Sequence, residues 1–146
     1  MPQALSCRAT VSIEQSVLLW CMRACVAAPR DDAAVRDALA HLGAASAWPA
    51  FGRFITVVRD YVPDMVVVNS VAWRGVGADE LVLLDVLALA QEQRSMEALL
   101  LLRAVFAPEA AAAALTAAEE VGACLVRAGW MVGATAPDVR RVAMAA

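Results

Sequence analysis

The stretch from Gly77 to Trp130 constrains the fold more than any other part of the sequence. It contains three strongly apolar runs, separated by short breaks near residues 91–94 and 107–108. Apolar residues recur in these runs at the three- and four-residue spacing of a helix. The stretch therefore predicts three consecutive helices at the packing centre of a small all-helical domain.

The preceding part of the chain predicts three further helices. Ser12 and Gln15 have the spacing of a capping box, so a first helix is expected from residue 13 to the proline at position 29. A second helix is expected through residues 31–42, capped by Asp31 or Asp32, and Gly43 suits its C-terminal end. A third is expected from Trp48 to the proline at position 63. The predicted fold is all-α, a compact bundle of five to six helices.

Residues 64–73 differ from the predicted helices around them. The sequence MVVVNSVAW is rich in β-branched residues, lacks helical amphipathicity and is followed by Gly75 and Gly77. It predicts an extended connector, whose free edge could pair with a second copy of the chain, and it is also where we expect a lid. The expected organisation is a flexible arm at 1–11, one helical domain at 12–133 and a flexible tail at 134–146.

Composition excludes some classes of function. All twelve basic residues are arginine, which is the bias of a GC-rich genome, and the net charge is −3. A protein that binds nucleic acid normally shows a basic face, so no nucleic-acid partner is expected.

The longest uncharged run, Ala38–Gly52, is too short and too broken for a membrane span. No secretory signal is recognisable, and a cytoplasmic location is expected. The chain has a loose likeness to small helical bacterial proteins, without a motif that names a family.

Few residues suggest chemistry. Cys21 and Cys25 lie four residues apart and are expected on one helix face with Ile13 and Val17, a spacing that could place two thiolates on one soft metal ion. Core packing is the better interpretation, because reduced cysteine is commonly buried and zinc needs further ligands.

His41 is the only histidine and is expected near the end of the second helix. No motif for nucleotide binding, hydrolysis or metalloprotease chemistry occurs. No cofactor is expected, and the sequence favours a protein that is not an enzyme.

Three carboxylates of the predicted helices are also explained without a functional site. Asp85 interrupts an apolar helical run, but its helical neighbours include Glu92, so a stripe that faces solvent is expected. Glu119 and Glu120 are adjacent, and adjacent helical residues point about 100° apart, so they are expected on a solvated face.

The apolar excess of the fourth and fifth predicted helices is the most informative feature for function. Leucine and valine cover nearly the whole circumference of both helices. A small domain has too few other helices to cover both, so association with a partner is favoured. The residues predicted to form the interface are Val82, Leu83, Leu89, Leu100, Leu101 and Trp73.

These observations predict a small helical protein that acts through protein–protein contact, as an adaptor, regulator or assembly factor, and that forms a homodimer. Two alternatives stay open. One is an apolar small-molecule binder with tryptophans at the mouth of its pocket, and the other is a metal-thiolate protein that uses Cys21 and Cys25.

Overall fold

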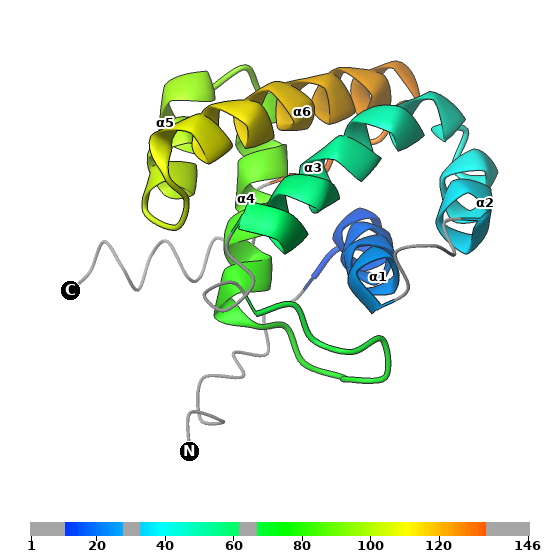
Figure 1. Cartoon of the computed structure of the whole chain (residues 1–146). Helices are drawn as coiled ribbons and strands as arrows, with labels where there is room; N and C mark the ends of the chain where they lie inside the picture. The colour runs from blue at the N-terminus through cyan, green and yellow to red at the C-terminus, as the bar shows by residue number, and fades with distance from the viewer. Residues whose placement is uncertain (1–10, 28–32, 62–66, 134–146) are drawn as a thin grey trace, which may run out of the picture.

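The computed structural model describes residues 11–27, 33–61 and 67–133. Within these ranges the chain forms helices and no strand, which confirms the predicted all-α class. Most of the arm and all of the tail predicted at 1–11 and 134–146 lie outside the described residues, as do residues 64–66 of the predicted connector. In chain order the elements are α1 (Ile13–Ala27), α2 (Ala33–His41), η2 (Ala45–Ala47), α3 (Trp48–Tyr61), α4 (Ala78–Gln91), α5 (Ser95–Arg103) and α6 (Pro108–Arg127) (Figure 1).

The first helix begins as its sequence predicts. The backbone N–H of Gln15 donates to Ser12 Oγ at 3.1 Å, and the backbone N–H of Ser12 donates to Gln15 Oε1 at 3.0 Å. This reciprocal pair satisfies two backbone donors that a helix start leaves free. Ile13 is 78% exposed, so its predicted place on the inner face is wrong. It is the first residue of the helix.

Glycines end α2 and α6 in the left-handed conformation. Gly43 has φ of +72° and Gly129 has φ of +78°. In both cases the next residue closes the end, since Ala44 N donates to Leu39 O and Trp130 N donates to Leu125 O, each at 2.8 Å. These are the bonds of the C-terminal glycine motif that the sequence predicts.

The α5 helix is shorter than its sequence suggests. Apolar spacing predicts that it continues to Phe106, but it ends at Arg103. The backbone N–H groups of Val105 and Phe106 both donate to Leu102 O, which tightens the chain into a turn. Phe106 is buried nonetheless, so the apolar pattern marks burial here and not helix.

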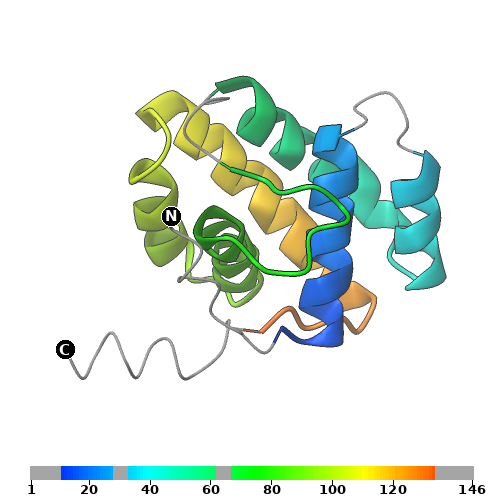
Figure 2. The same ribbon diagram turned by 90° about the horizontal axis from the view of Figure 1, so that it is seen from below.

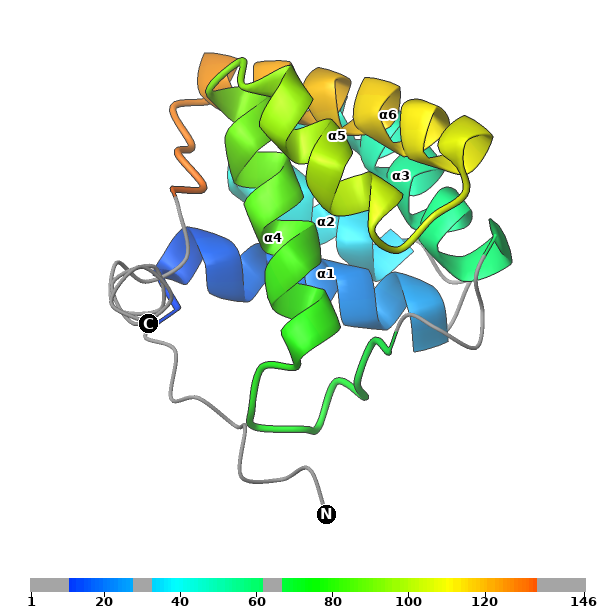
Figure 3. The same ribbon diagram turned by 90° about the vertical axis from the view of Figure 1, so that its left-hand side faces the viewer.

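The α6 helix packs against α3, α4 and α5, which makes it the central element of one half of the molecule (Figures 1 and 3). Small side chains let its neighbours approach closely. The tightest point is Gly122, where a Cβ atom would lie 2.9 Å from Gln91 Cα. The buried alanines of α6 are Ala110, Ala111, Ala114, Ala117 and Ala118. Neither α6 nor any other helix within the described ranges combines the length and apolarity needed to span a membrane.

The α1 helix packs against α2, α3 and α4, on the side of the molecule away from α5. Residues 67–77, called the connector loop below, have no regular structure and pass across α1 before they reach the start of α4 (Figure 2). The described part of the predicted connector is therefore non-helical, as expected. The loop, α1 and the first turn of α4 meet at one end of the bundle.

Candidate functional site

The connector loop is held against the bundle by a buried ion pair between Arg23 of α1 and Glu80 of α4. Arg23 Nε donates to Glu80 Oε2 at 2.7 Å, and Arg23 Nη2 donates to Glu80 Oε1 at 2.8 Å. The Arg23 side chain is 6% exposed and the Glu80 side chain is fully buried. A two-bond contact of this kind fixes the relative orientation of guanidinium and carboxylate, and so of the helices that carry them.

Glu80 also binds the backbone at both ends of the loop. Its Oε2 accepts from the N–H of Asn69 at 3.1 Å, and its Oε1 accepts from the N–H of Gly77 at 2.8 Å. The Asn69 side chain adds a third bond from Nδ2 to Oε1 at 2.8 Å. Glu80 is the third residue of α4, so its bond to Gly77 is also the carboxylate half of a capping box.

Arg23 holds the middle of the loop through backbone carbonyls. Its Nη1 donates to Trp73 O at 2.9 Å, and its Nη2 donates to Gly75 O at 2.6 Å. The guanidinium carbon also lies 5.6 Å from the centre of the Trp73 ring, within the range of a cation–π contact. One arginine side chain thus joins α1, α4 and two residues of the loop.

The carboxylate of Glu80 is charged, and both of its oxygens accept hydrogen bonds. Burial alone would raise its pKa, but the hydrogen bonds from Arg23, Gly77 and Asn69 outweigh burial and hold the pKa below its ordinary value. All of these bonds favour the ionised form, and the group is shielded from solvent. Glu80 is therefore suited to holding the loop and unsuited to exchanging a proton with a substrate.

The outer side of the same loop presents apolar side chains. Val67 is 59% exposed, Val71 is 44% exposed and Trp73 is 42% exposed. The start of the loop is tied down separately, because the N–H of Val67 donates to Asp79 Oδ2 at 2.8 Å. A fixed loop that carries an exposed indole and two exposed valines is the strongest candidate for a binding surface in the described part of the chain.

The residues predicted as an interface divide into three groups. Leu83 and Leu89 are 2% and 4% exposed and pack within the core, because α4 is surrounded by α1, α5 and α6. They are therefore already covered by the chain itself. Val82 and Leu101 are half-buried. Leu100 is 67% exposed, and Trp73, on the connector loop, is the other exposed member.

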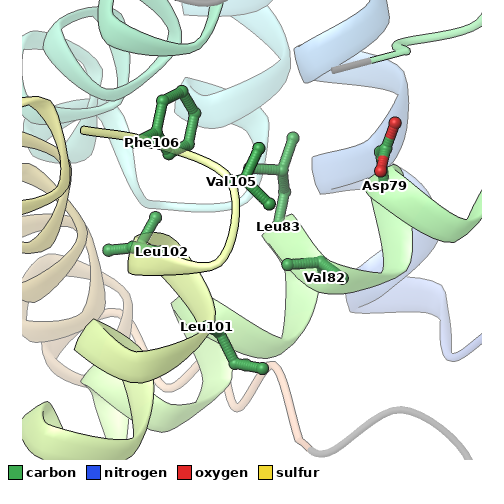
Figure 4. A pocket seen from close by; sticks show the side chains of 7 residues that line it. All are labelled: Asp79, Val82, Leu83, Leu101, Leu102, Val105 and Phe106. Carbon is green, nitrogen blue, oxygen red and sulfur yellow. The ribbon is translucent and has the colours of Figure 1, made fainter. Parts of the chain in front are cut away.

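A small pocket lies between α4 and α5, and Val82, Leu83 and Leu101 of the predicted interface are among the residues that line it (Figure 4). Its interior volume of about 10 Å³ has room for about one water molecule. The pocket is therefore too small to enclose an apolar ligand. The residues that line it are Asp79, Val82, Leu83, Leu101, Leu102, Val105 and Phe106.

The cysteines of the described chain are buried in the core and are not joined by disulfides. Cys21 is fully buried and Cys25 is 7% exposed. Burial, and then the neighbouring Cys25, raise the pKa of the Cys21 thiol to about 12. Within residues 11–27, 33–61 and 67–133, no group of three or more histidine, cysteine or carboxylate side chains is arranged to hold a metal ion.

The other polar candidates lie apart from this site. His41 is exposed at the end of α2, and Glu119 and Glu120 are exposed on α6, as predicted. Glu120 forms an ion pair with Arg53 of α3. Asp85 is half-buried on α4. None of these residues is among the hydrogen-bond partners of Arg23 and Glu80.

Sequence reasoning missed Arg23, Asn69 and Glu80. A signal for Arg23 exists, because it is the only charged residue between Glu14 and Arg30 in an otherwise apolar helix. A buried arginine needs an anionic partner, so this position could have been flagged. Nothing in the sequence indicates that its partner is Glu80, because 57 residues separate them and Glu80 resembles an ordinary acidic residue of a first helical turn.

Comparison with known proteins gives no further guide to this site. The chain matches no protein-family model, and no curated protein or solved structure matches it.

Proposed function

We propose that this protein acts by binding another protein in the cytoplasm, as an adaptor, regulator or assembly factor, and that the connector loop is its recognition surface. The observation that carries the proposal is the use of a buried ion pair to hold a surface loop. Arg23 and Glu80 make five hydrogen bonds to residues 69–77, and the loop exposes Val67, Val71 and Trp73.

The energetics of buried charge support this proposal. A buried ion pair generally adds little stability relative to apolar side chains of the same volume, because both charges lose their hydration. What the pair does supply is a defined conformation for the loop. Tryptophan is enriched among the residues that contribute most to protein–protein binding, and a loop that is ordered before binding loses less entropy when the complex forms.

The partner that we expect first is a second copy of the chain. The exposed Val67, Val71 and Trp73 of the loop support self-association. The α5 helix carries a separate exposed apolar area at Met96 and Leu100, which are 71% and 67% exposed. Neither of these side chains belongs to the connector loop, so the two areas can be tested separately.

Sedimentation equilibrium over a wide concentration range tests the proposal for a second copy. We expect the wild-type protein to dimerise and Trp73→Ala to weaken the dimer at least about tenfold, as loss of a buried aromatic anchor does at other interfaces. Leu100→Ala is the matched control for loss of an exposed apolar side chain outside the loop. Urea denaturation of each variant establishes that it is folded.

A co-purification experiment covers a different protein partner. A protein that is retained by the wild type and by Leu100→Ala, and lost from Trp73→Ala, would identify the loop as its binding site. A wild-type protein that stays monomeric at its highest concentration and retains no protein in this loop-dependent way would contradict the proposal.

The two alternatives have less support. The pocket between α4 and α5 has room for about one water molecule, so it does not support an apolar small-molecule binder. A metal-thiolate site needs ligands beside Cys21 and Cys25, and the described residues offer no such group.

A further inference from the structure

The indole of Trp73 lies against two groups that restrict its orientation. The guanidinium of Arg23 is 5.6 Å from the ring centre. On Gly75, an added Cβ atom would lie 2.8 Å from Trp73 Cη2 and 3.0 Å from Trp73 Cζ2, so the six-membered part of the ring rests directly on the glycine backbone. The ring is nevertheless 42% exposed, so it is held at the surface and not enclosed by the core.

Gly75 is required here by space and not by backbone conformation. The glycines with positive φ in the described chain are Gly43, Gly129 and Gly133. Gly75 is not among them, so an alanine at this position would meet no φ penalty. The three atoms nearest to its Cβ would all belong to the Trp73 ring, the first of them at 2.8 Å, which is closer than a Cβ atom can approach without a shift of the ring.

Arg23 fixes the backbone on both sides of this contact. It donates to the carbonyl oxygens of Trp73 and Gly75, at 2.9 and 2.6 Å. These are the two residues in contact, since the ring of Trp73 touches the backbone of Gly75. Because Arg23 is itself fixed by Glu80, neither peptide can shift independently of α1 and α4.

We propose that Arg23 and Gly75 are positioning residues, which hold the exposed indole of Trp73 in one orientation before any partner binds. The importance of this orientation for recognition rests on the proposed function, but the orientation itself is a property of the unbound protein. An anchor side chain that is already ordered loses little rotational freedom on binding, which favours a tighter complex.

The first test measures the motion of the ring in the unbound full chain. ¹⁵N relaxation of the tryptophan indole N–H groups, with the Trp73 signal assigned by its loss in Trp73→Phe, gives an order parameter. We expect a value near that of rigid backbone, about 0.85. A value below about 0.6 is typical of a flexible group and would overturn the proposal.

The second test is a double-mutant cycle between positions 73 and 75. Gly75→Ala should raise the unfolding equilibrium constant about tenfold in the wild type and have little effect in Trp73→Ala, because the conflict requires the ring. Gly52→Ala is a matched control, since its new methyl would meet the Trp48 ring at an ordinary 3.8 Å. Equal effects of Gly75→Ala in both backgrounds would mean that the Trp73 ring does not oppose the new methyl group, and would also overturn the proposal.

The two tests separate this inference from the proposed function. If the indole is mobile but partner binding still depends on Trp73, the positioning role is refuted and the recognition surface is not. If the indole is rigid but no partner binds through the loop, the proposed function is refuted and the positioning role is not. If both hold, Gly75→Ala should weaken partner binding while Trp73 stays exposed, and Gly52→Ala should leave binding unchanged.

Discussion

The two ends of α4 each hold a neighbouring irregular segment, but they do so with different chemistry. At the first turn, the charged Glu80 accepts the backbone N–H groups of Asn69 and Gly77 and is paired with Arg23. At the last residue, the neutral Gln91 accepts the N–H of Val132 at 2.8 Å and donates to Trp130 O at 2.5 Å. Both side chains are buried.

The difference teaches what each kind of contact requires. A neutral amide has both a donor and an acceptor, so Gln91 can bond to a backbone N–H and a backbone C=O without a second side chain. A carboxylate is an acceptor only and is charged, so Glu80 needs a cation brought from another helix. The charged end therefore depends on tertiary structure, and the loop that it holds exposes Val67, Val71 and Trp73.

The largest effect is expected from Arg23→Met. This change leaves the Glu80 carboxylate buried without its cation, and loss of one member of a buried pair costs about 3–5 kcal/mol of unfolding free energy. Urea denaturation monitored by circular dichroism measures it. Arg53→Met is the control, because its pair with Glu120 is half-exposed and such pairs contribute about 0–1 kcal/mol.

The double variant Arg23→Met with Glu80→Leu sharpens the interpretation. Replacement of both charges by apolar groups should recover part of the stability that the single change loses. If Arg23→Met lowers the unfolding free energy no more than Arg53→Met does, the charged end of α4 does not depend on its cation. The contrast between the two ends of α4 would then be wrong.

Gly122→Ala tests the close packing at the neutral end. An alanine in an open helix position would stabilise the protein, but this Cβ atom would lie 2.9 Å from Gln91 Cα. Overpacking of this kind typically costs about 1–3 kcal/mol, so we expect a net loss of stability. Ala123→Ser, at the exposed neighbouring position, should change the unfolding free energy by less than about 0.5 kcal/mol. A Gly122→Ala protein more stable than wild type would show that α4 and α6 can separate without loss.

Gln91→Leu should have a smaller effect. It removes the two hydrogen bonds to Trp130 and Val132, and leaves the Val132 N–H without its acceptor, at a cost of about 1–2 kcal/mol. Hydrogen exchange gives the local measurement, because the Val132 amide should exchange faster. Unchanged protection of Val132 would mean that another group holds the segment after α6.

The smallest effect is expected from acid, because acid removes no side chain. Comparison with Glu80→Gln separates the protonation of Glu80 from that of the other carboxylates. The lowered pKa of Glu80 means that its contribution to stability is complete above the ordinary pKa of 4.5 and is lost as pH falls through the lower value of the folded protein. The stability difference between wild type and Glu80→Gln should therefore shrink in that acidic window. The corresponding difference for Gln91→Leu should not change with pH, since an amide does not titrate. A Glu80→Gln difference that is constant with pH would contradict the lowered pKa.

Much of the fold could be predicted from local patterns. Apolar spacing indicates the helices, and the capping residues Ser12, Gly43 and Gly129 mark ends that the structure confirms. The end of α5 was predicted too late, because burial of Phe106 resembles a further helical turn. These signals act over a few residues, so one sequence suffices to read them.

The candidate site was predicted only in part. Trp73 and the non-helical connector were expected, but Leu83 and Leu89 were assigned to an interface although they are buried by the chain itself. The small number of helices suggests that α4 cannot be covered on all sides. The alanines and Gly122 of α6 overcome this limit, because they allow one helix to approach several neighbours closely.

The sequence by itself determined the helices, their ends and the presence of one irregular, valine-rich connector, because these depend on contacts between residues close in the chain. Only the tertiary structure decided which apolar faces are covered, and that Arg23 meets Glu80 across 57 residues to fix the loop around Trp73. The physical reason is that a charge can be buried only where a partner is brought to it. That meeting depends on how α1 and α4 cross, and no local pattern of residues encodes the crossing.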